Sequence, residues 1–347
     1  MKKSLLLVLA MLVTAAALPL AVFAGRIPSE PFTAAAQTTI ATSVTPASAV
    51  LRTTAIRTVA TTATSAEPPA SEPTIAVMVD GIRTEMDVEA AVVAIVAAEM
   101  PALFPVEALK AQAVAARTYV AYRAAHPVSA HAEAVICDDP SHCCALADLD
   151  ALAVGWGTSG QDYAARIVAA VEATAGEILT YEGEPIMAVF HAMSAAQTNS
   201  AADVWGGAVD YLVSVAAPEA EEEPERYRDS AVFAADEFRT YFLAEHPDAK
   251  LDLQLLNWFS DFDYAESGLL RAVSVGGVRV SGQALRSLCG LRSAAMTITQ
   301  GTDRIRFDTV GYGHGVGMSQ HGAKIFAQQG LSYRAILAHY YVGCELV

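Results

Sequence analysis

One thirteen-residue segment constrains the fold of this 347-residue chain more than any other: Gly311 to Ala323, Gly-Tyr-Gly-His-Gly-Val-Gly-Met-Ser-Gln-His-Gly-Ala. Glycine at this density indicates backbone that turns tightly or approaches another group closely. Residues 304–310 before it alternate as a strand does, and residues 318–329 after it have a helical pattern that Gly330 would end. We therefore predict a functional turn between a strand and a helix. No Gly-Lys-Ser/Thr follows, which argues against a phosphate-binding loop; a purely structural turn remains the alternative.

The net charge of the chain limits the class of molecule that it can bind. The formal net charge of −16 argues against nucleic-acid binding, which favours a basic face. An anionic cell-wall polymer would be repelled by the same charge, so local positive groups must contribute if such a polymer is the substrate. Part of the negative charge lies in residues 219–225, for which we predict a solvated loop.

The first 73 residues divide into two segments that precede the folded region. Lys2 and Lys3 precede an apolar run that ends near Phe23, so residues 1–24 are predicted to be a membrane anchor or a signal segment. An uncleaved anchor would keep the catalytic domain outside the cytoplasm at the cell membrane, whereas cleavage after Ala24 would release it. Residues 25–73 are rich in Ala, Thr, Ser and Pro, which predicts a disordered linker.

Residues 74–347 predict one domain of the α+β class, with mixed helices and β-hairpins around one cleft. The caps and breakers are Asp87 before a helix that ends at Met100, Pro105 before the next helix, and Ser281 before a short one. The predicted elements are a strand at 74–79, helices at 88–100, 106–125 and 156–176, and hairpins within 177–190 and 270–280.

A second dense segment, residues 98–119, contains Glu-Met-Pro and then Glu-Ala-Leu-Lys-Ala-Gln-Ala-Val-Ala-Ala-Arg-Thr-Tyr. Together with Gly-His-Gly-Val-Gly-Met-Ser-Gln at 313–320, it resembles the stage II sporulation protein D (SpoIID) family. Shorter segments between them are similar to the middle signature of that family and come in the same order: 189–194, 198–200, 203–206 and 211–214. The resemblance covers residues 74–347 and includes the amidase enhancers.

The resemblance implies a peptidoglycan lytic transglycosylase, which cleaves MurNAc–GlcNAc glycan strands, stripped of their stem peptides, to 1,6-anhydroMurNAc ends during sporulation engulfment. Glu99 matches the acidic residue of the family motif and would be the single acid/base. Its place behind an apolar run suggests partial burial, which raises a carboxyl pKa. Arg117 matches a basic position, from which it would orient Glu99 or bind a carboxylate of the sugar, and Lys110 is a weaker substrate-binding candidate.

Sugar hydroxyls require many hydrogen-bonding groups of modest strength. The predicted groove donors and acceptors in the motifs are His191, Ser194, Thr198, His314, Ser319 and Gln320. The chain departs from the family pattern at Ala195 and Ala196, where relatives usually have a glycine pair. The resemblance also implies an amidase and membrane proteins of sporulation as partners.

A cluster of histidines and cysteines predicts a metal site. His131, Cys137 and Cys143 are spaced six and six residues apart, and thiolate and imidazole are preferred ligands of zinc. Some family members carry a similar zinc site in this insertion, so the resemblance implies structural Zn²⁺ held by these three residues and His142. A disulfide from Cys137 to Cys143 or Cys144 is the alternative in an oxidising exterior.

Two other functions remain open. A non-catalytic wall-binding amidase enhancer would keep the glycine segment without needing Glu99. A zinc hydrolase would need a zinc ion with an open coordination position.

Overall fold

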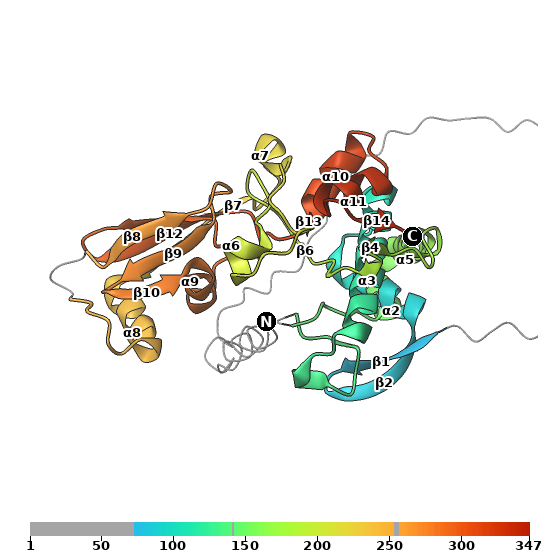
Figure 1. Ribbon diagram of the computed structural model, residues 1–347, viewed down its shortest axis with the longest axis horizontal. Helices are drawn as coiled ribbons and strands as arrows, with labels where there is room; N and C mark the ends of the chain where they lie inside the picture. The colour runs from blue at the N-terminus through green and yellow to red at the C-terminus, as the bar shows by residue number, and fades with distance from the viewer. Residues whose placement is uncertain (1–72, 141, 253–256) are drawn as a thin grey trace, which may run out of the picture. The chain divides into compact units, whose positions relative to one another are not determined.

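The computed structural model describes residues 73–140, 142–252 and 257–347, in which helices and strands are mixed along the chain as the α+β prediction requires (Figure 1). The predicted segment at 1–24 lies outside the described residues, and so does the linker at 25–73 apart from Pro73. Within the three described ranges, every helix is either too short or too polar to cross a bilayer.

The first hydrophobic core is built on the long helix α3, which contacts α2, α5, α10 and α11. Ala108, Ala111, Ala113 and Ala116 of α3 are buried, and these short side chains let the neighbouring helices approach closely. The helices around this core are α2 (Val88–Glu99), α3 (Val106–Ala125), α5 (Gly160–Glu172), α10 (Gln320–Gln328) and α11 (Tyr333–Tyr340).

Local signals define the ends of α2 and the start of α3, as predicted. The Asp87 side chain accepts a hydrogen bond from the Ala90 N–H and caps α2. Met100 has extended backbone because the following Pro101 disfavours helical geometry, so α2 ends at Glu99. Pro105 directly precedes α3. Glu99 is therefore the last residue of α2.

Small sheets and short helices complete this part of the molecule. The sheets have the strand orders β2-β1-β3, β14-β4-β5 and β13-β6. Their strands are β1 (Thr74–Val79), β2 (Ile82–Asp87), β3 (Ile136–Cys137), β4 (Leu179–Tyr181), β5 (Glu184–Pro185), β6 (Phe190–His191), β13 (Met318–Ser319) and β14 (Glu345–Leu346). The short helices are η2 (Ser129–His131), α4 (Leu149–Gly155), η3 (Gly157–Ser159), α6 (Ala201–Trp205) and α7 (Glu219–Glu222).

Three predictions for this part were wrong in their extent. The helix predicted at 318–329 begins only at Gln320, because Met318 and Ser319 form β13. The hairpin predicted within 177–190 is limited to β4 and β5, because β6 pairs in parallel with β13 instead. The helix predicted at 156–176 begins only at Gly160 and ends at Glu172. A Cβ at Gly160 would lie 1.8 Å from the Ala153 carbonyl oxygen, so this glycine marks a close crossing of α4 and α5.

A second core lies among strands contributed by residues 228–310. The sheets have the orders β10-β9-β8 and β11-β12-β7, and Phe238, Phe242 and Phe307 are fully buried beside them. The predicted strand at 304–310, the hairpin within 270–280 and the Ser281 cap are confirmed. The elements are β7 (Arg228–Ala234), α8 (Ala235–Glu245), β8 (Phe259–Tyr264), β9 (Leu270–Val275), β10 (Val278–Ser281), α9 (Gly282–Leu288), β11 (Met296–Gln300) and β12 (Arg304–Val310).

Candidate active site

Glu99, the last residue of α2, has a partly buried carboxyl group with two hydrogen-bond partners. Its Oε1 accepts from the Ala145 backbone N–H at 3.0 Å, and its Oε2 accepts from Gln320 Nε2 at 3.3 Å. Burial raises the pKa of Glu99, although the two hydrogen bonds partly offset that effect. The predicted partial burial is therefore confirmed, and the group has the electrostatics of a proton donor.

Glu99 lines a cavity of about 550 Å³, a size within the range of ligand pockets. The cavity lies where the end of α2, the loop that contains Cys143 and Cys144, β6, α9 and the glycine segment meet. Glu99 and Arg286 are its only Asp, Glu, Lys or Arg side chains among the described residues. The polar lining residues are Glu99, Tyr119, His191, Arg286, Tyr312, His314 and Gln320.

The glycine segment forms one wall of the cavity through close backbone contacts. Its first four glycines all have positive φ, which L side chains rarely adopt. A Cβ at Gly315 would lie 2.2 Å from Asn199 Nδ2, and one at Gly317 would lie 2.1 Å from the Val189 carbonyl oxygen. The segment therefore needs glycine to pack against residues 189–199, which confirms the predicted tight turn.

His191 and His314 lie together on this wall, with their ring centroids 5.6 Å apart. His191 bonds Ser194 Oγ at 2.7 Å through Nε2 and the Val316 carbonyl at 3.1 Å through Nδ1. Burial lowers the pKa of His191 to about 3 and that of His314 to about 4. Both imidazoles are therefore neutral near pH 7. Both ring nitrogens of His191 are used in bonds within the protein, and His314 Nδ1 accepts from the Val316 N–H at 3.1 Å.

Ser194 and Ser319 do not line the cavity, because both bond the buried carboxyl of Glu219. Glu219 Oε1 accepts from the Ser194 N–H at 2.9 Å and from the Ser319 hydroxyl. The prediction of a solvated loop was wrong for Glu219, which begins α7 and has no exposed surface. Burial raises the pKa of this carboxyl as well. Glu219 thus ties the loop after β6 to the start of α10, next to Gln320.

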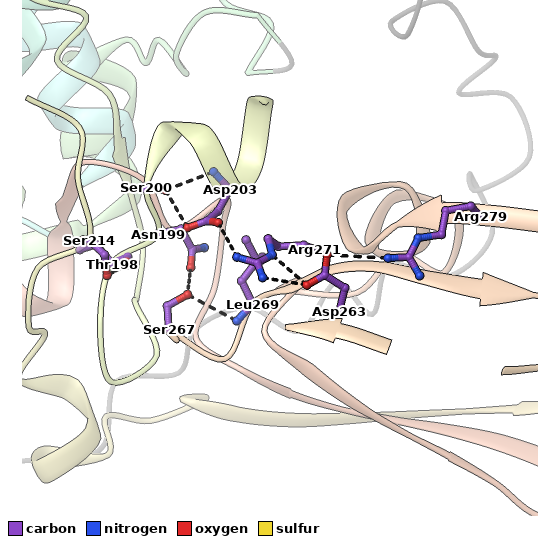
Figure 2. A network of polar contacts seen from close by, with 10 residues as sticks. All are labelled: Thr198, Asn199, Ser200, Asp203, Ser214, Asp263, Ser267, Leu269, Arg271 and Arg279. Atoms are coloured by element: carbon purple, nitrogen blue, oxygen red, sulfur yellow. Dashed lines mark hydrogen bonds and ion pairs between the residues drawn. The ribbon is translucent and has the colours of Figure 1, made fainter. Parts of the chain in front are cut away.

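Thr198 is also buried and belongs to a polar network that holds the segment around it. It accepts from the Val215 N–H at 2.9 Å, and its carbonyl accepts from Ser214 Oγ at 2.6 Å. The next residue, Asn199, accepts from Ser267 Oγ at 2.7 Å and donates to the His314 carbonyl at 2.9 Å. Figure 2 shows the network continuing through Asp203 to the strands of the second core.

The Arg117 side chain forms no hydrogen bond with Glu99 and binds other groups instead. Its Nε and Nη2 donate to the two carboxylate oxygens of Glu89 at 2.7 and 2.6 Å, and it also bonds the carbonyls of Val171 and Glu177. Only 3 % of the Arg117 surface is exposed, so its guanidinium N–H groups are directed at these protein acceptors. The predicted orientation of Glu99 by Arg117 is therefore absent. Lys110 also lies outside the cavity lining and pairs with Glu107 at 2.9 Å.

The four predicted metal ligands converge on one point. Suitable donor atoms of His131, Cys137, His142 and Cys143 all lie within 4.8 Å of one another. His131 Nε2 is 3.1 Å from Cys143 Sγ, and His142 Nδ1 is 3.3 Å from Cys137 Sγ. The cysteines are free thiols here, not the alternative disulfide. Two sulfur and two nitrogen donors suit tetrahedral zinc.

The other ring nitrogen of each histidine has an oxygen partner, as is common for metal-binding imidazoles. His131 Nδ1 lies 3.1 Å from the Ala134 carbonyl, and His142 Nε2 lies 3.5 Å from a carboxylate oxygen of Asp139. The same loop reaches the cavity, because Cys143 and Cys144 line it and Ala145 donates to Glu99. The four predicted metal ligands therefore lie just before Ala145, whose N–H holds the Glu99 carboxyl.

Sequence reasoning missed three contributors to this site: Arg286, Glu219 and the Ala145 N–H. Arg286 lies on the short helix α9, far along the chain from every motif, and no local pattern distinguishes it. The burial of Glu219 depends on residues 194 and 319, which are distant in sequence. A backbone donor such as Ala145 has no side-chain signal.

Comparison with known proteins finds similarity to stage II sporulation proteins. Residues 81–181, which include Glu99 and the donor cluster, match the family described as SpoIID, stage II sporulation protein. The chain is 35% identical over 259 residues to stage II sporulation protein D of Bacillus amyloliquefaciens, covering 74% of this chain and 72% of that protein. Its identity to the Bacillus subtilis (strain 168) protein of that name is 34% over 256 residues, or 74% and 73% of the two chains.

A more distant similarity is to the amidase enhancer of Bacillus subtilis (strain 168), which is 25% identical over 296 residues, 72% of this chain but 39% of that protein. Identity above 30% to two sporulation proteins extends over more than 70% of each chain. The chain therefore belongs to the SpoIID family of stage II sporulation proteins.

Proposed function

We propose that this protein is a lytic transglycosylase that cleaves the bond between MurNAc and GlcNAc in peptidoglycan glycan strands. The observation that carries the proposal is the Glu99 carboxyl, whose pKa is raised by burial and which lines a cavity of suitable size. Among the described lining residues it is the only carboxylate. Most glycosidases use two carboxylates, whereas a transglycosylase can act with one.

In the proposed reaction, protonated Glu99 donates its proton to the glycosidic oxygen as the bond from C1 of MurNAc to that oxygen breaks. The C6 hydroxyl oxygen of the same MurNAc then bonds to C1, and its proton passes to Glu99. The products are a 1,6-anhydroMurNAc end and a GlcNAc hydroxyl, and the acid is regenerated. The proton balance closes on one carboxyl without a water molecule.

The neighbouring groups suit this cycle. The Ala145 N–H and Gln320 Nε2 stabilise the carboxylate that forms after the first step, since hydrogen bonds to the charged form favour it. His191 and His314, which also line the cavity, are neutral near pH 7. They add no positive charge to the cavity and do not compete for the catalytic proton.

Digestion of purified glycan strands, with and without stem peptides, tests the proposal. Full-length protein should release fragments that end in 1,6-anhydroMurNAc, identified by mass spectrometry. Fragments with reducing ends would make the enzyme a hydrolase, and intact strands would remove the enzymatic proposal.

The similarity to an amidase enhancer supports one alternative, a wall-binding protein that stimulates a separate amidase. Such a protein would not need the Glu99 proton. Glu99→Gln separates the two functions, because it should leave amidase stimulation intact if that is the activity.

We also propose that His131, Cys137, His142 and Cys143 hold one structural zinc ion, which would fix the loop that carries Ala145. Four protein donors complete a tetrahedron, which favours a structural ion over the zinc hydrolase alternative. Metal analysis should find about one zinc per chain. The double variant Cys137→Ser, Cys143→Ser should lose both zinc and stability, because metal binding is linked to folding. Metal-free wild-type protein would contradict the assignment.

The site of action is proposed to be the outer face of the cell membrane during sporulation engulfment, with a cell-wall amidase that strips stem peptides as partner. The apolar segment at 1–24 would supply the anchor. Cell fractionation with terminal sequencing tests this, since full-length protein should stay in the membrane pellet. Soluble protein that starts at Gly25 would indicate a cleaved signal instead.

A further inference from the structure

Arg286 is an arginine of the Glu99 cavity whose charge has no acidic partner. It projects from α9 and is the only Lys or Arg among the described residues that line the cavity. Its Nε donates to the Arg292 carbonyl at 3.1 Å, and its Nη1 donates to Gln283 Oε1 at 3.4 Å. Both acceptors are neutral, and among the described residues no carboxylate forms an ion pair with Arg286.

Two other arginines with little exposed surface each have a carboxylate partner. Arg117 donates hydrogen bonds to the Glu89 carboxylate, and the Arg292 guanidinium lies 3.2 Å from an Asp229 carboxylate oxygen. Arg286 is desolvated enough for burial to lower its pKa, yet a guanidinium stays charged at any physiological pH. A cation that is partly buried and unpaired has lost solvation without regaining an ion pair. An anion bound in the cavity would supply the missing interaction.

The surroundings of Arg286 favour an anionic ligand with a carboxylate. The hydrogen bonds to Arg292 and Gln283 use Nε and Nη1, so the Nη2 donors have no protein partner among the described residues. His191 and His314, which face the same cavity, are neutral near pH 7. The guanidinium is therefore the group in this lining that can neutralise an anion, and its planar donors match a carboxylate.

Building on the proposed function, we propose that Arg286 binds the free lactyl carboxylate of MurNAc next to the bond that Glu99 cleaves. In a strand without stem peptides this carboxylate is charged, whereas a stem peptide converts it into a neutral amide. Arg286 is thus a specificity-determining residue that selects glycan whose peptides have been removed. It also supplies the local positive charge that a chain of net charge −16 needs to bind an anionic polymer.

The test uses full-length Glu99→Gln protein, so that the sugars are bound without being cleaved. The two probes are GlcNAc–MurNAc oligosaccharides of one length, one with free lactyl carboxylates and one with the same groups converted to primary amides. Calorimetry should show about tenfold or tighter binding of the acid than of the amide. That preference should shrink as salt rises, because the interaction is ionic.

Arg286→Gln, added to Glu99→Gln, should abolish the preference, and Arg286→Lys should keep part of it because the charge remains. Arg279→Gln is the matched control: it removes the same charge at a side chain that is 48% exposed and outside the cavity lining, and it should keep the full preference. Equal binding of acid and amide, or a preference that survives in Arg286→Gln, would overturn this inference alone. Binding of neither oligosaccharide would overturn the proposed function together with it.

Discussion

Glu99 and Glu219 are two carboxyls with similar electrostatics and different access. Each accepts one backbone N–H and one side-chain donor, and burial raises the pKa of each. Among the described residues neither has a cationic partner. Glu99 lines a cavity, whereas Glu219 has no exposed surface and joins two segments of the fold. A raised pKa therefore marks both residues, and only contact with the cavity distinguishes an acid that can meet a substrate from one that holds the structure.

The largest expected effect is on catalysis. Glu99→Gln should lower the rate of glycan cleavage by about 10²–10⁴-fold, the usual contribution of a general acid/base, while the protein stays folded. Glu172→Gln makes the same chemical change at an exposed residue of α5 and should cleave at the wild-type rate. The measurement is the initial rate on stripped glycan. Wild-type activity in Glu99→Gln would break the distinction between the two carboxyls.

A third acidic residue sharpens the comparison, because Glu89 has the cationic partner that Glu99 and Glu219 lack. Glu89→Gln would leave the buried Arg117 charge uncompensated and should lower the free energy of unfolding by about 3 kcal/mol. This is at the low end for a buried pair because Glu89 is 32% exposed. Activity per folded molecule should change far less than in Glu99→Gln.

Urea unfolding measures this effect, with Glu85→Gln as the control. Glu85 pairs with Arg83 at the surface, where both side chains are about half exposed, so its loss should cost little. Equal effects of the two substitutions would show that Arg117 is not dependent on Glu89.

Glu219 should matter for stability more than for chemistry. Glu219→Ala would leave the Ser194 N–H buried without an acceptor and should cost about 1–3 kcal/mol of unfolding free energy. Glu219→Gln keeps an acceptor oxygen and should cost less. Thermal or denaturant unfolding of both variants checks this order. A larger loss in the Gln variant would mean that the carboxyl itself, rather than its acceptor, is required.

The smallest effect is a dependence of stability on pH. The folded state raises the pKa of Glu219, so its stabilising contribution is complete below the ordinary carboxyl pKa and is lost as pH rises through the raised value. Glu219→Gln lacks this titration, and it should gain stability relative to the wild type as pH rises above the ordinary carboxyl pKa. Unfolding curves at several pH values measure the difference. If Glu219→Gln lost stability relative to the wild type as pH rises, the result would contradict the raised pKa of Glu219.

Local signals explain what the sequence predicted well. Asp87, Pro101 and Pro105 act on their own neighbours, so the end of α2 and the position of Glu99 could be predicted. The four donor residues lie within thirteen positions of one another, and the short loop brings them together. The family resemblance implied the set of four, and their short separation along the chain lets the donor atoms converge.

Long-range packing explains the sequence-based predictions that were wrong. The burial of Glu219 and the pairing of Arg117 with Glu89 depend on segments far away in sequence. Ser194, Thr198 and Ser319 stand in the expected motifs, yet their hydroxyls bond within the protein rather than toward the cavity. Polar type and motif membership located the right segments. They did not say which side of each segment faces the cavity.

Cleavage in water enriched in ¹⁸O tests the central claim most directly. If Glu99 acts as the single acid/base, the C6 hydroxyl closes the ring and the new MurNAc ends should contain no ¹⁸O. The yield of these unlabelled anhydro ends should fall as pH rises through the raised pKa of Glu99, because the acid must be protonated. MurNAc ends that carry ¹⁸O would show attack by water and would contradict the account.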